Sequence, residues 1–145
     1  MIKPLNGEQK TALLSRRRVG RLGCIVAGAP YVVPVNYVFD GENIYSHSLP
    51  GTKIAALRQN PAACVQVDDL VDEFHWQSVM AVGDYQEITS ERERDSVLSK
   101  LLARLPGLTP VESTEGPVEK LQEAQGRHPV VYRIKIREVS GVGEF

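Results

Sequence analysis

The fold is indicated most clearly by residues 32–48, which read VVPVNYVFDGENIYSHS. Two runs rich in β-branched and aromatic residues flank Asp40-Gly41, and an Asp-Gly pair in that setting is a strong hairpin signal. Alternation along the first run places Val33, Val35, Tyr37 and Phe39 on one face of their strand. The stretch therefore predicts two antiparallel strands, at 32–39 and 43–48, that bury one side.

Outward from this hairpin, the sequence predicts four further strands. They cover residues 21–26, 63–67, 74–88 and 130–137, and Gly83 within the third marks a bulge or bend. Helices are predicted at 8–18, 52–60, 90–105 and 117–125, and Ser90 with Glu93 forms a capping box at the start of the third. The acidic segment 68–73 is interpreted as a turn.

This order of elements predicts a mostly β protein, a β-barrel with α insertions. Hairpins dominate and helical crossovers are scarce, which favours a six-stranded antiparallel split or closed barrel over a doubly wound sheet. The chain has 145 residues, the size of one domain, so we expect a single domain over 1–145. A β domain of this size has little room to enclose a cofactor, and a site shared between two subunits would overcome that limit.

The composition argues against several classes of partner. Seventeen Lys and Arg against 18 Asp and Glu leave a net charge of −1, which offers no broad field for nucleic acid or a membrane surface. No run reaches the ~20 apolar residues of a spanning helix, and the N-terminus lacks signal-peptide features, so we expect a cytoplasmic location. Cys24 and Cys64 have no partner at ligand spacing, which predicts reduced core thiols and no metal site.

Residues 45–53, YSHSLPGTK, form the outline of an anion site. A strand ends in hydroxyls, and a Gly turn then opens a helix whose free N–H groups favour a phosphate. Ser48 and Thr52 can donate hydroxyl hydrogen bonds, and Lys53 can supply a compensating charge. An ordinary capped helix with a solvated lysine has the same spacing, so both interpretations stay open.

Two strands carry features suited to a planar ligand. Pro34 cannot donate to a sheet ladder and marks an edge or an opening, and Asn36 beside it offers an amide. Trp76 and Ser78 share one face of the long strand and place an aromatic ring beside a hydroxyl. An edge strand with a surface Asn, and a Trp packed in the core, are the alternatives.

His47 is the one candidate for a catalytic histidine, because it stands at the mouth of the phosphate turn. A hydrogen-bonded structural histidine is the alternative. The arginine run 16–18, with Arg21, could add charge near a phosphate, but the pattern also fits a solvated helix end. No Ser-His-Asp set or carboxylate pair can be singled out.

As a set, several short motifs resemble the flavin-binding split barrels related to pyridoxamine 5′-phosphate oxidase, in particular the small nitroimidazole-resistance proteins. The motifs follow one another between residues 19 and 88, and they are Gly20-Arg21-Leu22-Gly23, Pro30-Tyr31-Val32-Val33-Pro34-Val35-Asn36-Tyr37, Ile44-Tyr45-Ser46-His47-Ser48, Gly51-Thr52-Lys53-Ile54, Asn60-Pro61 and Trp76-Gln77-Ser78-Val79. The resemblance implies an antiparallel split barrel and a homodimer with flavin mononucleotide (FMN) across the interface.

Carried over by position, the resemblance also implies a set of cofactor-binding residues. Those beside the isoalloxazine ring would be Pro34, Val35, Asn36 and Tyr37; those around the ribityl phosphate would be His47, Ser48, Thr52 and Lys53; and the adjoining strand, of this or the partner subunit, would add Trp76, Ser78 and Val79.

The leading functional hypothesis is an FMN-dependent oxidoreductase that acts on a small electrophilic substrate, nitro compounds included. In the nitroimidazole-resistance relatives a histidine at the position of His47 is linked to function. A non-catalytic module that holds or senses flavin or haem is a second hypothesis, since no complete acid–base set is visible. A deazaflavin-dependent reductase is a third.

Overall fold

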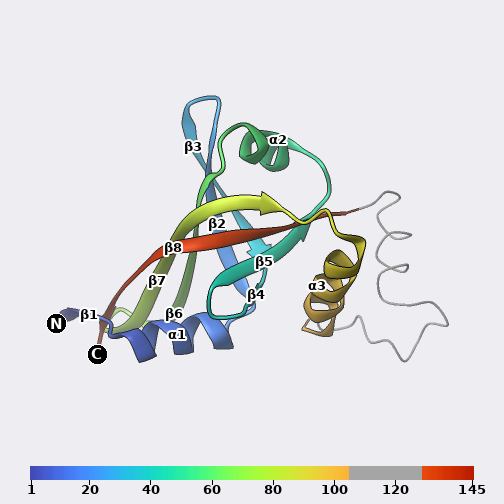
Figure 1. Cartoon of the computed structure of the whole chain (residues 1–145). Helices are drawn as coiled ribbons and strands as arrows, with labels where there is room; N and C mark the ends of the chain where they lie inside the picture. Colours follow the sequence, from blue (N-terminus) through green and yellow to red (C-terminus); the bar gives the residue numbers. More distant parts are fainter. Residues whose placement is uncertain (105–128) are drawn as a thin grey trace.

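The computed structural model describes residues 1–104 and 129–145, and its centre is one curled antiparallel sheet (Figure 1). Hydrogen bonds join the strands in the order β3-β2-β6-β7-β8-β5-β4, and β1 pairs with β8. The strands are β1 (Ile2–Pro4), β2 (Val19–Val26), β3 (Ala29–Asn36), β4 (Val38–Phe39), β5 (Asn43–Ser48), β6 (Ala62–Asp72), β7 (His75–Glu87) and β8 (Val130–Glu144).

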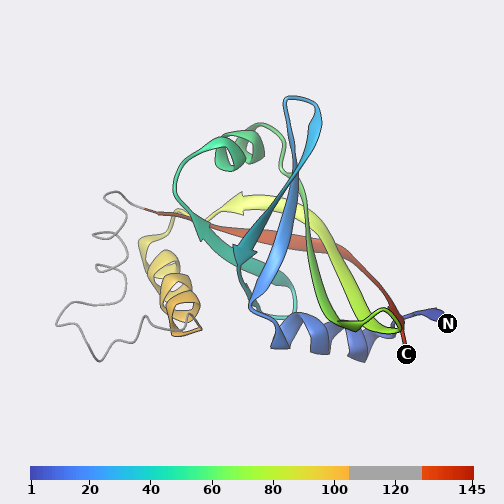
Figure 2. The ribbon, with the colours of Figure 1, turned by 180° about the vertical axis from the view of Figure 1, so that it is seen from behind.

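Three helices are described around this sheet: α1 (Gly7–Arg16), α2 (Thr52–Gln59) and α3 (Glu91–Ala103). Helix α1 crosses one end of the sheet, α2 lies at the opposite end beside the β2–β3 hairpin, and α3 lies next to β5 (Figures 1 and 2). Asn6 caps α1 through a capping box with Gln9, and Ser90 caps α3 by accepting from the Glu93 N–H. Within the described residues, no helix has the length and apolar character needed to span a membrane.

The concave face of the sheet holds the main hydrophobic core. Residues from β2, β5, β6, β7 and β8 meet Leu13 and Leu14 of α1 and Ile54 and Leu57 of α2 there. The Tyr37 hydroxyl donates a 2.6 Å hydrogen bond to the carbonyl oxygen of Leu14, which ties α1 to the sheet. A second cluster lies under α3, whose buried residues are Val97, Leu98, Leu101 and Leu102.

Several predictions from the sequence are confirmed. The fold is mostly β and antiparallel, and β4 pairs with β5 across Asp40-Gly41 as a hairpin. The pairing of β7 with β8 shifts register between Val82 and Gly83, where a bulge was expected. Cys24 belongs to the main hydrophobic core as expected, whereas Cys64 is only partly buried.

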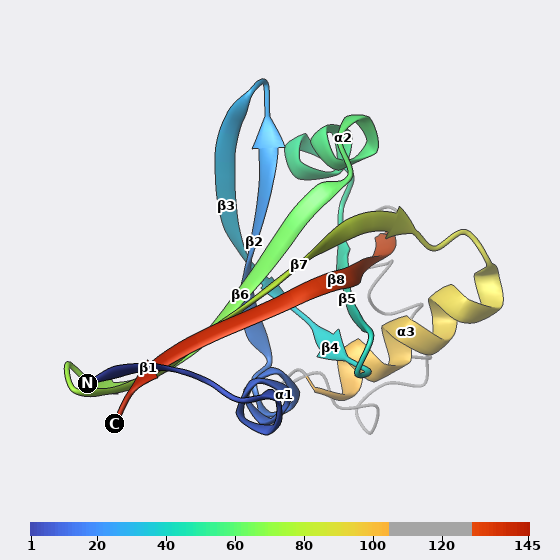
Figure 3. The same cartoon turned by 60° about the vertical axis from the view of Figure 1, so that its left-hand side comes forward.

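The predicted count of six strands is wrong, because residues 1–104 and 129–145 already form a sheet of eight. The expected strand 32–39 is interrupted at Tyr37, which lies between β3 and β4. A short strand, β1, was not foreseen, since three residues carry no periodic signal; it pairs with the end of β8, close to both termini (Figure 3). The last strand also runs on to Glu144 rather than ending at Arg137.

The acidic segment 68–73 is mostly strand rather than turn. β6 extends to Asp72, and only Glu73-Phe74 form the turn into β7. The charges of this segment favour a loop, but its residues pair with β7, and Asp68 and Asp69 face basic partners, so the strand continues. The predicted helix 117–125, and with it most of the helical insertion 90–125, lies outside the described residues.

Candidate functional site

The start of α2 has the properties of an anion site. Its N-cap is Gly51, which has no side chain to accept from the first free N–H groups, and the first turn contains no acidic residue. Lys53 instead places a positive charge in that turn, beside the positive end of the helix dipole. A cation at this position is unfavourable unless an anion offsets it, so the arrangement favours a bound phosphate.

His47 lies at the end of β5, next to this helix start. Its Nδ1 is buried and has no hydrogen-bond partner in the described part of the chain. Burial lowers the pKa of His47, and the nearby Lys53 ammonium lowers that pKa further. The pKa of Lys53 is itself lowered by burial. The His47 imidazole and the Lys53 ammonium are thus held close together with too few acceptors around them. Such a pair of donors is what an anion needs.

Cys24 of β2 completes the surroundings of Lys53. Burial raises the pKa of the Cys24 thiol, and the Lys53 charge partly opposes that rise. The thiol is 5% exposed and is a member of the main core. It therefore forms part of the wall beside the lysine rather than a nucleophile open to solvent.

A hydrogen bond links this region to β3. The buried Ser46 Oγ donates to the carbonyl oxygen of Asn36 at 2.6 Å, which brings the end of β3 against β5. His47, the next residue on β5, therefore stands beside the part of β3 that carries Pro34 and Asn36.

Pro34 and Asn36 are exposed on β3, the strand at one end of the sheet. Their partners on β2 are Arg21 opposite Pro34 and Val19 opposite Asn36. Since β3 pairs with β2 alone and contacts β5 only at its end, its outer edge is open to a flat molecule along much of its length. Both residues are thus placed where a planar ligand could lie.

Trp76 and Ser78 are partly exposed on β7, three strands away from β3. The Ser78 hydroxyl accepts a 3.0 Å hydrogen bond from Gln66 Nε2 of β6. β2 and β6 lie between β3 and β7, so three strand spacings, about 14 Å, separate the two strands, and Ser78 is offset from Pro34 along β7 as well. One chain does not bring these two groups of residues together.

The other residues proposed for cofactor binding fall into two groups. The side chains of Val35, Tyr37 and Val79 point into the core, so they can offer a ligand only their backbone. Tyr37 is further committed by its bond to Leu14, and burial raises the pKa of its phenol to about 12. Ser48 donates to the Leu49 carbonyl, and Thr52 is exposed at the first position of α2.

A cluster of arginines and aspartates is a further candidate for a functional site, and the sequence alone does not show that these residues meet. Arg16 and Arg17 both pair with Asp69, at 2.9 and 2.6 Å, and Arg21 pairs with Asp68 at 2.9 Å. Their neighbours come from β6, about fifty residues away, so only the fold could assemble them. The available signal was the arginine run together with the acidic run 68–73.

Solved structures share this fold. A FAD-binding protein from Mesorhizobium loti is 32% identical, with a TM-score of 0.77 over 100% of this chain and 99% of that one. A 5-nitroimidazole antibiotic resistance protein from Bacteroides thetaiotaomicron, described as putative, is 18% identical, with a TM-score of 0.74 over 99% of this chain and 89% of that one. The predicted fold class is confirmed by these likenesses.

Sequence comparison assigns the chain to a family. An uncharacterised protein of Rhizobium meliloti (strain 1021) is 31% identical over 87 residues, which span 60% of this chain and 58% of that protein. The model of the pyridoxamine 5′-phosphate oxidase family matches residues 7–142, which is nearly the whole chain. The protein therefore belongs to the pyridoxamine 5′-phosphate oxidase family.

Proposed function

We propose that this protein binds a flavin nucleotide, FMN, with its phosphate at the start of α2 and its ring on β3. The observation that carries the proposal is the uncapped helix start, where Lys53 and the unpartnered His47 Nδ1 are held together. Asn36 and the backbone beside Pro34 offer polar groups to the rim of a ring that lies on β3, the strand that Ser46 joins to β5. The chain's own residues thus fit both ends of such a ligand.

The comparisons support the cofactor class. The Mesorhizobium loti protein, similar over the whole chain, is described as FAD-binding. FAD contains the FMN moiety, so the site at α2 and β3 suits the half that the two nucleotides share. The mass of the bound nucleotide decides between them.

The site is proposed to be completed by a second copy of the chain. β7, which carries Trp76 and Ser78, lies three strand spacings, about 14 Å, from β3 and Pro34 on the same sheet, too far for these residues to line one ring together. The convex face between them exposes apolar side chains, among them Val32 and Met80. Burying such a face against its symmetric copy would bring Trp76 and Ser78 of one subunit toward Pro34 of the other.

The proposed activity is flavin-dependent reduction of a small electrophilic compound, nitro compounds included. A bound flavin supplies hydride or electron transfer. His47 would orient the cofactor or substrate through its buried, unpartnered Nδ1. The likeness to the Bacteroides thetaiotaomicron protein supports the nitro class only through the shared fold.

The first experiment is an absorption spectrum of the purified protein, followed by heat release and mass measurement of any chromophore. Flavin bands with the mass of FMN are the expected result. The mass of FAD would correct the nucleotide and keep the site. A deazaflavin or haem spectrum, or a colourless protein that added flavin does not restore, would contradict the proposal.

The dimer is tested by sedimentation equilibrium. The chain mass is 16.0 kDa, so twice that mass is expected. Met80→Glu places a charge on the convex face and should yield monomers with less bound flavin. Thr89→Glu adds the same charge at an exposed loop position and should leave both properties unchanged. A wild-type monomer that retains flavin would disprove the shared site.

Activity is tested with flavin-loaded protein, a reduced nicotinamide donor and a panel of nitro compounds and quinones. Turnover above free flavin is expected, and His47→Asn should lower it more than His75→Asn does, because His75 is exposed and pairs with Asp72. If flavin is bound but no acceptor is reduced, the protein is a binding module.

A further inference from the structure

A second site is suggested by a pocket at the junction of α1, β2 and β6. It has a volume of about 510 Å³, and four arginines line it together with Asp68, Val19 and Leu70. The arginines are Arg16, Arg17, Arg18 and Arg21. Four guanidinium groups around one hollow are costly for a structural role alone, because like charges repel.

Two carboxylates offset only part of this charge in the described part of the chain. Asp69 forms ion pairs with both Arg16 and Arg17, at 2.9 and 2.6 Å, and Asp68 forms one with Arg21 at 2.9 Å. The three paired arginine side chains remain 42–48% exposed. The pocket therefore combines fixed, oriented donors with an excess of two positive charges.

Arg18 is positioned differently from the other three. Its Nη1 donates to the Arg104 carbonyl oxygen at 3.3 Å, and Arg104 in turn donates to the Arg17 carbonyl oxygen at 2.8 Å. The end of α3 thus braces the end of α1 while the Arg18 side chain stays exposed. Its guanidinium still has donors to offer.

The pocket adjoins the ring site proposed above rather than the phosphate site. Arg21 stands opposite Pro34 and Val19 opposite Asn36 in the pairing of β2 with β3. Cys24, which marks the Lys53 end, lies three residues farther along β2, about 10 Å away. An anion held by the arginines would therefore be distinct from the flavin phosphate, on the other side of the ring.

We propose that this arginine pocket binds a phosphate group of the small molecule that exchanges electrons with the flavin. The excess of two positive charges matches a phosphate dianion better than a single carboxylate, and guanidinium forks bind phosphate oxygens in pairs. Exposed Leu70 and Val19 at the rim can contact the apolar part of such a molecule. That the ligand exchanges electrons rests on the proposed flavin site, whereas that it carries an anion is inferred from the arginines of the pocket alone.

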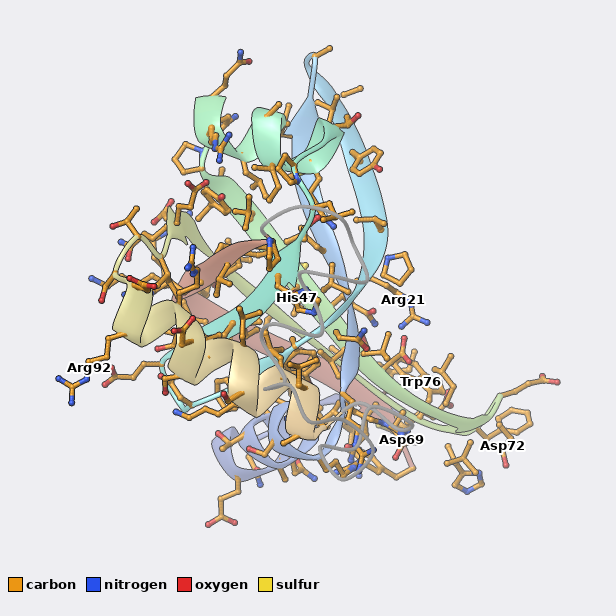
Figure 4. The ribbon with its side chains drawn as sticks, turned by 90° about the vertical axis from the view of Figure 1, so that its right-hand side faces the viewer. Arg21, His47, Asp69, Asp72, Trp76 and Arg92 are labelled. Carbon is orange, nitrogen blue, oxygen red and sulfur yellow. The ribbon has the colours of Figure 1, made fainter. Side chains whose placement is uncertain are left out.

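The test uses isothermal titration of the purified protein with inorganic pyrophosphate at low ionic strength. The test variant is Arg18→Gln with Arg21→Gln, and Arg17 is left intact because it ties α1 to β6. The matched control is Arg92→Gln, which removes an exposed charge from α3 on the far side of the molecule (Figure 4). Thermal melting and flavin content are recorded for each protein.

Pyrophosphate should bind the wild type and Arg92→Gln alike, and at least about tenfold more weakly to the double variant, whose flavin content and melting should remain normal. Equal binding by the double variant, equal loss in Arg92→Gln, or equally tight binding of succinate would overturn the proposal. Titration of a flavin-free preparation separates the two proposals. If pyrophosphate binds although the protein binds no flavin, the arginine pocket is supported and only the flavin site is contradicted.

Competition then identifies the source of the phosphate. Displacement of pyrophosphate by NADPH, at lower concentration than by glycerol 3-phosphate, assigns the pocket to the electron donor. Displacement by glycerol 3-phosphate alone assigns it to a phosphorylated acceptor. Both results support a phosphate site, whereas displacement by neither contradicts it.

Discussion

Ser46 Oγ donates a 2.6 Å hydrogen bond to the carbonyl oxygen of Asn36, and this contact joins the two halves of the proposed flavin site. β5 carries His47 next to the phosphate end, and β3 carries Pro34 and Asn36 at the ring end. β3 is the end strand on one side of the sheet and β5 is the next-to-last strand on the other, and no ladder of described residues pairs the two. The bond therefore ties the ring end directly to the phosphate end, in addition to the chain connection through β4, which pairs with β5.

Ser46→Ala should lower the free energy of unfolding by about 1–3 kcal/mol, because the Asn36 carbonyl loses its donor in a buried setting. Flavin affinity should fall as well, since β3 would no longer be held against β5. Denaturant unfolding and fluorescence titration with FMN measure the two effects. Ser140→Ala, at an exposed position of β8, is the control. A destabilised variant with unchanged affinity would show that the bond does not position the site.

Lys53→Ala should weaken flavin binding by about 1–3 kcal/mol, the range for losing one charge-assisted hydrogen bond. Stability of the flavin-free protein should hold or rise, since the lysine is half-buried beside the positive end of α2. Lys135→Ala, exposed on β8, should bind flavin normally. Unchanged affinity in Lys53→Ala would place the phosphate elsewhere.

The flavin-free protein should lose stability in acid through His47. The pKa of His47 in the folded chain is lowered from 6.5, so below about pH 6.5 the unfolded state binds a proton that the folded state resists. The free energy of unfolding should therefore fall as the pH drops from 7 to 5, and His47→Gln should reduce that slope.

Denaturant titrations at several pH values give this slope. His75→Gln, at an exposed site, should leave the His47 contribution in place. FMN should flatten the slope in the wild type, because a phosphate near His47 favours its protonated form. An identical slope in wild type and His47→Gln would refute the prediction.

Gly83→Ala should destabilise the fold by more than about 3 kcal/mol, because a methyl group at the bulge would collide with the Lys135 carbonyl of β8. Gly7→Ala is the matched control, since nothing lies within 4 Å of the added methyl and alanine favours the helix. Thermal melting of both variants measures the contrast, which similar melting temperatures would contradict.

Local chemistry made much of this protein predictable. The Asp40-Gly41 hairpin, the Gly83 bulge and the Ser90 cap each depend on a few adjacent residues, and each occurs where the sequence places it. The turn before Thr52 and Lys53 belongs to the same class, because a helix start exposes N–H groups whatever surrounds it.

Tertiary structure decided the rest. Strand β1 exists only because β8 offers it an edge, and residues 68–72 remain extended because β7 and the arginines of α1 and β2 satisfy them. The separation of Pro34 from Ser78 follows from strand order, which periodicity does not encode. A pattern of residues specifies the conformation of its own segment and the face it buries, whereas partners distant in sequence are selected by packing of the whole chain.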